Sequence, residues 1–352
     1  MNNKTYNVAI AGYGVVGQRR RGYIDSHPNF NTVAVCDIKY KENPVSSEQG
    51  ANVYTNYKDM LANEKIDVLF VCLTNDIAAE VTIAGLNNNM HVFCEKPPGR
   101  NLKDIADVIA AERKNPHLKL KYGFNHRYHE SILKALEIIE SGELGTLINM
   151  RGVYGKSKII SYQSTWRAKR DIAGGGILLD QGIHMADLMR MFAGEFVEFK
   201  SYVDNHFWGH DVEDNAYALM KSERGVVAFL NSTATQWRHR FHLEISLSKG
   251  AIILSGILSG SKSYGAETIT IVRPGEDDAG DPMETTIRYN QDNSWSDEIQ
   301  EFANAVLDNT PIKFGTSRDA FKTMELVYKI YCADDQWREK YKLVDSVEGF
   351  EI

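Results

Sequence analysis

The first third of the chain alternates short apolar runs with segments whose apolar residues recur at helical spacing. Apolar runs at residues 7–11, 32–36, 68–73, 91–94 and 119–124 predict strands, and residues 15–26, 77–86 and 102–113 predict helices. Strands that are apolar throughout and are separated by helices are typical of a parallel sheet buried on both faces. The pattern therefore predicts an α/β domain, to which we assign residues 1–124.

Beyond Gly123 the pattern changes to longer strands joined by short turns. After a predicted helix at residues 131–141, strands are predicted at residues 148–154, 198–205, 216–220, 226–232, 241–246, 251–254 and 268–272. Their close spacing favours a large, mostly antiparallel open sheet. Helices are predicted at residues 178–192, 296–307 and 317–331. Residues 125–352 are therefore predicted to form an α+β domain, whose closing helices are candidates for packing back on the first domain.

Composition and charge narrow the class of protein. The 352 residues are 43% hydrophobic and 25% charged, as in ordinary globular domains, and the net charge of −7 argues against a nucleic-acid partner. No apolar run reaches the ~18 residues that span a bilayer, and the polar start of the chain predicts no signal peptide. The four cysteines are widely spaced and form no CxxC pair, so we expect reduced thiols in the cytoplasm and no metal site.

A glycine-rich motif follows the first predicted strand and opens the first predicted helix. It reads Gly12-Tyr13-Gly14-Val15-Val16-Gly17, a GxGxxG in the strand–turn–helix context in which the pattern binds a dinucleotide. The glycines permit the tight turn, the approach of the pyrophosphate and the packing of helix on strand, and the free N–H groups of the helix attract phosphate. The motif predicts a Rossmann domain, and a glycine-rich turn that binds nothing is the alternative.

Asp37 ends the second predicted strand, where a carboxylate binds the adenosine ribose hydroxyls and repels the 2′-phosphate of NADP. This placement predicts NAD rather than NADP. Arg19, Arg20 and Arg21 lie inside the first predicted helix, and we expect them to be mostly solvent-facing. Thr74 and Asn75 follow a buried strand, so this turn is expected to line the cofactor crevice unless it is a simple connection.

Two further segments carry candidate chemistry. Lys96 follows the strand at residues 91–94 and is held by two prolines, although a surface Lys-Pro turn would read the same way. A run of three glycines, 174–176, precedes Asp180 and His184, which are four residues apart and share one face of a helix. Histidine moves protons near neutral pH, and a nearby carboxylate orients its ring. Asp187 is a second candidate for orienting His184, while a plain surface Asp–His pair is the alternative.

These residues together resemble the Gfo/Idh/MocA family, the glucose–fructose oxidoreductase and inositol dehydrogenase type. The resemblance extends over the whole chain and rests on the glycine motif, Glu95-Lys96-Pro97, Gly123–Tyr128, Trp166-Arg167 and Gly174–His184. One departure lies at residues 76–80, where many members carry a histidine and this chain has none.

The resemblance implies a role for each matched residue. Lys96 would polarise the reacting hydroxyl, Asp180 would bind substrate and steer the base, and His184 would be the general acid/base. Glu95, Trp166 and Arg167 are expected at the cofactor together with the glycine motif, Asp37, Thr74, Asn75 and Lys96. Asn125 and Arg127 are expected at the substrate, and Tyr128 near the domain boundary. Separately from the resemblance, the chain offers candidates for a polar, aromatic substrate pocket, with a structural or surface role as the alternative for each: Tyr154, Lys156, Trp237, Arg238, His239 and His242. The resemblance also implies a homodimer or homotetramer.

The predicted function is hydride transfer between NAD and a sugar or nucleotide sugar, with a role in sugar modification for bacterial surface polysaccharides. An inositol or a sugar acid is the alternative substrate. A catalytically silent NAD-binding sensor is the alternative of a different class, and an enzyme that keeps and recycles its cofactor is a third reading.

Overall fold

The computed structural model describes residues 4–157, 165–259, 264–275 and 280–352, which fold into two compact units. The first unit consists of Met1–Phe124, Trp295–Lys322 and Val347–Ile352, and the second of Asn125–Ser294 and Thr323–Ser346. Residues 295–322 and 347–352 thus join the first unit although they lie far from it in the sequence.

The sheet of the first unit is a doubly wound parallel sheet. Its strands are β1 (Tyr6–Ala11), β2 (Phe30–Cys36), β3 (Ser47–Glu48), β4 (Ala51–Tyr54), β5 (Val68–Val71), β6 (His91–Glu95) and β7 (Leu120–Gly123). They lie in the order β3-β4-β2-β1-β5-β6-β7, and the pairs are parallel except for β3 with β4. The winding reverses between β1 and β5, which is where ligands bind in such sheets.

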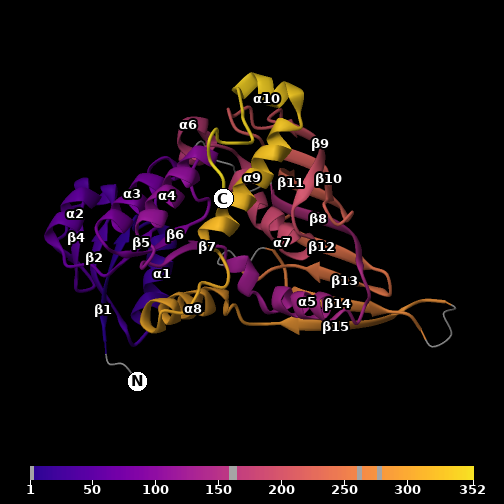
Figure 1. The fold of residues 1–352 in the computed structure, drawn as a ribbon, viewed down its shortest axis with the longest axis horizontal. Coiled ribbons are helices and arrows are strands. Elements are labelled where there is room, and N and C mark those ends of the chain that lie inside the picture. Colours follow the sequence, from indigo (N-terminus) through magenta and orange to yellow (C-terminus); the bar gives the residue numbers. More distant parts are fainter. Residues whose placement is uncertain (1–3, 158–164, 260–263, 276–279) are drawn as a thin grey trace. The chain divides into compact units, whose positions relative to one another are not determined.

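The helices of this unit are α1 (Val15–Asp25), α2 (Tyr57–Asn63), α3 (Asn75–Asn87), α4 (Leu102–Lys114) and α8 (Ser294–Asp308). Helix α8, from the orange end of the chain in Figure 1, packs on the sheet near β1. Its Phe302 meets Phe70 and Phe93 edge-on, with ring centroids 5.8 and 5.5 Å apart. The core of the first unit is therefore completed by a helix that begins about 170 residues further along the chain than the end of its last strand, β7.

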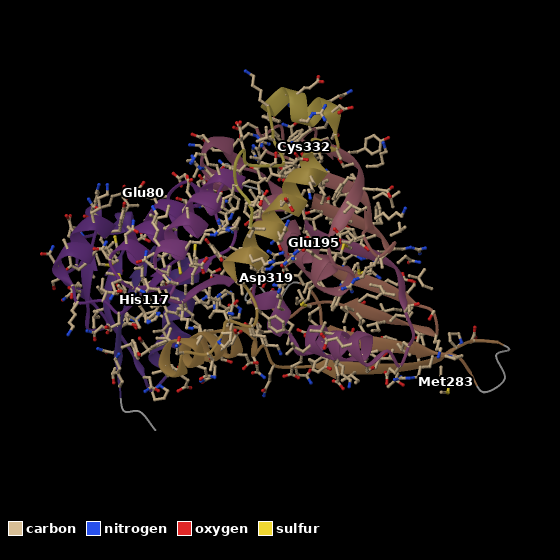
Figure 2. The ribbon with its side chains drawn as sticks, viewed as in Figure 1. Glu80, His117, Glu195, Met283, Asp319 and Cys332 are labelled. Carbon is tan, nitrogen blue, oxygen red and sulfur yellow. The ribbon has the colours of Figure 1, made fainter. Side chains whose placement is uncertain are left out.

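The second unit contains the predicted mostly antiparallel sheet. Its strands are β8 (Leu147–Ser157), β9 (Phe196–Asp204), β10 (Asn215–Ser222), β11 (Val227–Gln236), β12 (Arg240–Leu247), β13 (Gly250–Ser255), β14 (Glu267–Arg273) and β15 (Met283–Tyr289). They lie in the order β15-β14-β13-β12-β8-β11-β10-β9, with β8 and β11 parallel and the other pairs antiparallel. Strand β15, which begins at the labelled Met283 in Figure 2, was not predicted. The predicted fold class is confirmed.

Helices pack on one face of this sheet. They are α5 (Glu130–Ser141), α7 (Ile183–Ala193) and α9 (Ser317–Cys332), with the short helices α6 (Arg170–Ala173) and α10 (Asp335–Tyr341) further along. A Cβ atom on Gly152 of β8 would lie 2.4 Å from Cε of Met189, and one on Gly182 would lie 2.4 Å from Oγ of Ser232. Small residues therefore let α7 sit directly on β8 and β11.

Candidate functional site

The glycine motif forms a tight turn between β1 and α1. Gly12 has φ +89°, and a Cβ atom there would lie 2.3 Å from the carbonyl oxygen of Cys72 at the end of β5. A Cβ atom on Gly17 would lie 2.0 Å from the carbonyl oxygen of Gly12. A Cβ atom on Gly14 would meet no described atom within 4 Å, and Val15 at the start of α1 is 75% exposed. Packing thus requires glycine at positions 12 and 17. Gly14 leaves open space at the helix N-terminus, and this space fits a dinucleotide pyrophosphate.

Asp37 is tied to this turn by hydrogen bonds. Its Oδ2 accepts from the backbone N–H of Tyr13 at 2.8 Å, and its Oδ1 accepts from the N–H of Lys39 at 2.9 Å. The Lys39 ammonium in turn donates to the carbonyl oxygen of Tyr13 at 2.6 Å. The acidic residue at the end of β2 and the phosphate-binding turn are therefore held in one arrangement. Thr74 and Asn75 lie at the carboxyl end of β5, where α3 begins.

The expectation that Arg19, Arg20 and Arg21 are mostly solvent-facing is wrong for two of the three. Arg20 is fully buried and Arg21 is 4% exposed, whereas Arg19 is half-buried. The Arg21 guanidinium donates to the carbonyl oxygens of Glu48 and Gln49. Arg20 is buried because two carboxylates neutralise it, Glu95 and Glu298, each at 2.6 Å.

The ion pair of Arg20 also decides where Glu95 points. Glu95 ends β6, and its Oε1 accepts from Nε of Arg20, so the carboxylate is turned toward α1. The guanidinium lies over the rings of Phe93 and Trp295, 4.5 and 4.2 Å from their centroids. The strand end that immediately precedes Lys96 is thereby fixed to the helix that follows the glycine turn. The Lys96–Pro97 peptide bond is cis.

In the second unit, a buried carboxylate holds the glycine run. Glu213 accepts from the backbone N–H groups of Gly176 and Leu178 at 2.7 and 3.0 Å and from the hydroxyl of Tyr331 at 2.6 Å. A Cβ atom on Gly176 would lie 2.0 Å from the carbonyl oxygen of Glu213. Burial raises the pKa of Glu213. The glycines therefore permit close approach of the Glu213 segment, and that segment fixes the start of the helix bearing the candidate residues.

The predicted helix over residues 178–192 is present, but its first turn is wide. Leu178–Gly182 is a π-helical turn that runs into α7, so Asp180 and His184 lie on successive turns of a continuous helix. Asp180 accepts from Nζ of Lys156 on β8 at 3.3 Å, and Nε of Arg167 lies 3.4 Å from the same oxygen. π-turns inside α-helices are frequent at functional sites.

His184 is buried at 4% exposure, and the ring of His126 stacks on it. The two centroids are 3.7 Å apart and the planes are inclined by 12°. Nε2 of His126 hydrogen-bonds to the hydroxyl of Tyr154 at 3.0 Å, and burial raises the pKa of that phenol well above its usual range. Tyr154, a predicted substrate contact, is therefore linked to His184 by way of His126, which bonds to one and stacks on the other. The sequence did not single out His126.

Asp187 does not orient His184 by the contacts observed. Its carboxylate accepts from Nε and Nη2 of Arg127 at 2.6 and 2.7 Å and from the hydroxyl of Thr323 at 2.7 Å. Arg127, which was predicted at the substrate, is 3% exposed and forms the buried ion pair with Asp187. Asn125 donates to Oγ of Ser294 at 3.1 Å. Arg127 thereby ties the turn at residues 125–128 to α7, and Asn125 ties it to Ser294.

Trp166 and Arg167 form a short 3₁₀ turn, Trp166–Ala168, in the second unit. The Arg167 guanidinium lies 4.4 Å from the Trp166 ring centroid as well as beside Asp180. The second unit thus brings Tyr154, Lys156, Arg167, Asp180 and His184 together, and adds His126 and Glu213. The glycine motif, Asp37, Thr74, Asn75, Glu95 and Lys96 belong to the first unit.

Two family models cover the chain in succession. Residues 6–124 match an oxidoreductase family with an NAD-binding Rossmann fold, and residues 132–253 match the GFO/IDH/MocA C-terminal domain. The chain belongs to the GFO/IDH/MocA oxidoreductase family. The predicted family, its oxidoreductase class and its NAD cofactor are confirmed by these matches, and the glycine turn described above fits that cofactor.

Individual relatives agree with this assignment. The chain is 26% identical to inositol 2-dehydrogenase of Salmonella typhimurium over 276 residues, 76% of this chain and 79% of that protein. It is 25% identical to the structure of myo-inositol 2-dehydrogenase from Lactobacillus plantarum, with a TM-score of 0.77 over 98% of this chain and 100% of that one. It also shares its fold with the WlbA dehydrogenase from Bordetella pertussis in complex with NADH and UDP-GlcNAcA, at 16% identity and a TM-score of 0.77 over 94% and 97% of the two chains.

In the described part of the chain, no helix is both long and apolar enough to cross a membrane. Among the same residues, no group of three His, Cys, Asp or Glu side chains is placed to hold a metal ion.

Proposed function

We propose that this oxidoreductase transfers hydride between NAD and a hydroxyl-bearing carbon of a sugar, an inositol or a nucleotide sugar. The observation that carries the proposal is the helix at residues 178–193, which sets the carboxylate of Asp180 and the buried imidazole of His184 on successive turns within a family of NAD-binding oxidoreductases. The named activities of the inositol dehydrogenases support the substrate class.

The residues of the first unit would hold the cofactor. The open space at Gly14 would receive the pyrophosphate at the start of α1, and the carboxylate of Asp37 would bind the adenosine ribose. NAD, when bound, accepts or returns the hydride of the reacting carbon. Thr74, Asn75 and the segment at Glu95 and Lys96 follow the carboxyl ends of β5 and β6, where this class of sheet binds ligands. Because a carboxylate repels a 2′-phosphate, we propose NAD over NADP.

The proton chemistry would belong to His184 and Lys96. His184 would take the hydroxyl proton when the substrate is oxidised and return it when the ketone is reduced. The Lys96 ammonium would donate a hydrogen bond to the same oxygen and stabilise its developing negative charge. Asp180, held by Lys156 and Arg167, would accept a hydrogen bond from a neighbouring substrate hydroxyl and so place the reacting one.

The charge around Asp180 bears on the substrate. Two cations, Lys156 and Arg167, face this one carboxylate, which leaves positive charge at the site. A sugar acid or a nucleotide sugar would use that charge, and the second of these is the substrate class expected for surface-polysaccharide synthesis. Replacing Lys156 by methionine should then raise KM for an anionic substrate more than for myo-inositol.

The deciding experiment follows NADH absorbance with purified protein, NAD or NADP, and a panel of myo-inositol, free sugars, uronic acids and UDP-linked sugars. We expect turnover with NAD and one of these classes. His184→Ala and Lys96→Ala should retain NADH binding and lose ~10²–10⁴-fold in turnover, as removal of a general acid–base group does. His206→Ala, at a side chain that is 90% exposed, is the matched control. Full turnover in His184→Ala would overturn the assignment, and NAD binding without turnover on any class would favour a sensor.

We also propose a homodimer or homotetramer that uses the sheet of the second unit. On the face away from the helices, Leu219 pairs with Phe229 and Tyr217 pairs with Tyr202 across β9, β10 and β11. These side chains are 39–78% exposed and form an apolar row beside the exposed Lys200 and Lys221, which favours a second copy as the occupant. Leu219→Asp should shift the mass measured by light scattering to the monomer, whereas Lys221→Asp on the same strand should not.

A further inference from the structure

We propose that His126 is a positioning residue for His184: a neutral imidazole that stacks on the acid/base ring, fixes its orientation and stabilises its protonated form. This inference rests on the proposed role of His184. It assigns a function to a residue outside the Lys96, Asp180 and His184 set.

The stack itself constrains the His184 ring. His126 lies in the 3₁₀ turn Asn125–Tyr128 and His184 lies in α7, so two separate elements bring the rings together. Their centroids are 3.7 Å apart, the planes are within 12° of parallel, and the residues are 7% and 4% exposed. A ring in face-to-face contact on one side cannot tilt toward that side, so the nitrogens of His184 are confined to one plane.

A chain of hydrogen bonds keeps His126 neutral. Nε2 of His126 lies 3.0 Å from the hydroxyl of Tyr154, and Nδ1 lies 3.3 Å from Oδ1 of Asn125, which can only accept. We therefore assign the hydrogen to Nδ1, so that the Tyr154 hydroxyl donates to Nε2. Nδ2 of Asn125 donates to Oγ of Ser294 at 3.1 Å, and that hydroxyl donates to Oδ1 of Asp292 at 2.6 Å. This series of hydrogen bonds gives His126 one N–H and one accepting nitrogen, which is the uncharged tautomer. Because burial raises the pKa of Tyr154, its phenol stays a donor.

A neutral ring and a charged ring at this position would act in opposite directions. The π face of a neutral ring attracts a cation that lies over it, so the neutral His126 favours the imidazolium form of His184. A protonated His126 would place two like charges face to face, and the pair would share a single proton over most of the pH range. The tautomer set by Tyr154 and Asn125 therefore makes His126 a support for the proton on His184.

The carboxylates around the stack each have a basic partner. The titratable groups there comprise Asp180 with Lys156 and Arg167 on the preceding turn, Asp187 with Arg127 on the following turn, His129 with Glu267 beside His126, and the phenols of Tyr154 and Tyr264. Each carboxylate in this set faces a basic partner, and the ring of His126 is the contact on the face of His184.

The test compares two variants of similar volume, His126→Phe and His126→Leu, in the full-length chain. Both are apolar and cannot titrate, but phenylalanine keeps a π face against His184 and leucine does not. The pKa of His184 is read from ¹³C-histidine NMR titrations without substrate, with its signal assigned by loss in His184→Gln. From the strength of cation–π contacts we expect His126→Leu to lower this pKa by about 0.4 to 1.5 units relative to His126→Phe. His206→Ala is the control for loss of an exposed histidine.

An independent arm removes the donor instead of the ring. In Tyr154→Phe the Nε2 atom of His126 is released to take a proton, so the two rings should titrate as a coupled pair and the pKa of His184 should fall. The acid limb of kcat/KM, measured with NAD and myo-inositol, should move to lower pH in His126→Leu and Tyr154→Phe. Equal His184 pKa values in His126→Leu, His126→Phe and Tyr154→Phe would overturn the inference. That result is distinct from failure of the proposed function, which is full turnover in His184→Ala.

Discussion

Replacing Arg20 by methionine should destabilise the first unit by about 4 kcal/mol, because breaking a buried ion pair costs about 3–5 kcal/mol. The Arg20 guanidinium is fully buried and contacts Glu95 and Glu298, each at 2.6 Å. Methionine has a similar length, but it leaves both carboxylates without this cation. The contacts of the guanidinium with the rings of Phe93 and Trp295 are lost as well. The larger part of the expected cost is therefore the desolvated charge of Glu298, which is 0% exposed.

The cost should depend on pH with a definite sign. Burial raises the pKa of Glu298 from 4.5 to about 7, while Arg20 and Lys121 oppose the rise. A carboxyl whose pKa is raised by folding contributes stability that is present below its unfolded pKa and lost as pH rises through the folded value. Without Arg20 the folded pKa of Glu298 should rise further. The penalty for Arg20→Met should then be larger near about pH 8, where wild-type Glu298 is ionised, than near about pH 5, where it is protonated in both proteins.

Urea unfolding followed by circular dichroism at both pH values measures this cost. Arg19→Met is the matched control, because Arg19 lies on the same helix and is half-buried, and it should change the unfolding free energy by less than about 1 kcal/mol. Arg20→Met/Glu298→Gln should recover part of the loss, since it also removes the stranded charge. A cost below about 1 kcal/mol for Arg20→Met, or an equal cost at the two pH values, would refute the electrostatic reasoning.

Three further outcomes follow from the same contacts. Asp37→Ser should lower the preference for NADH over NADPH in fluorescence titrations by roughly 10-fold or more, because a like charge opposite the 2′-phosphate is removed; an unchanged ratio would exclude a role in cofactor choice. Gly17→Ala should lower the free energy of unfolding by about 1–3 kcal/mol, because its Cβ would lie 2.0 Å from a carbonyl oxygen. Gly14→Ala should leave stability intact and weaken NADH binding; a larger loss of stability for Gly14→Ala than for Gly17→Ala would contradict the roles assigned to these glycines. Glu213→Gln should destabilise by about 1–3 kcal/mol and reduce turnover, since its amide would face two N–H donors; activity equal to wild type would show that this anchor does not position the helix.

The chain's local patterns were sufficient for the fold class and for the chemistry of single segments. Uninterrupted apolar strands predicted the parallel sheet, and closely spaced strands predicted the antiparallel one. Both predictions were possible because a strand buried on two faces is apolar throughout, whereas a strand buried on one face alternates apolar and polar residues. The glycine motif could be assigned because its three positions have separate steric requirements within six residues, and the structure shows the close approaches at Gly12 and Gly17. The motifs at Lys96, Asp180 and His184 were recognisable for the same reason, since each is contiguous.

What the sequence could not give were the contacts between distant residues. Arg20 looked like a solvent-facing helix residue because its partner Glu298 is 278 positions away, and only the packing of α8 on the sheet brings that carboxylate to it. Helical spacing made Asp187 a reasonable partner for His184, but its carboxylate forms an ion pair with Arg127, which lies in another element. His126 lay inside the matched segment Gly123–Tyr128 but was given no role of its own, because its place on the face of His184 depends on where the turn after β7 meets α7. Local steric and burial rules act within a few residues, whereas the pairing of buried charges and rings is decided by which elements the tertiary fold brings into contact.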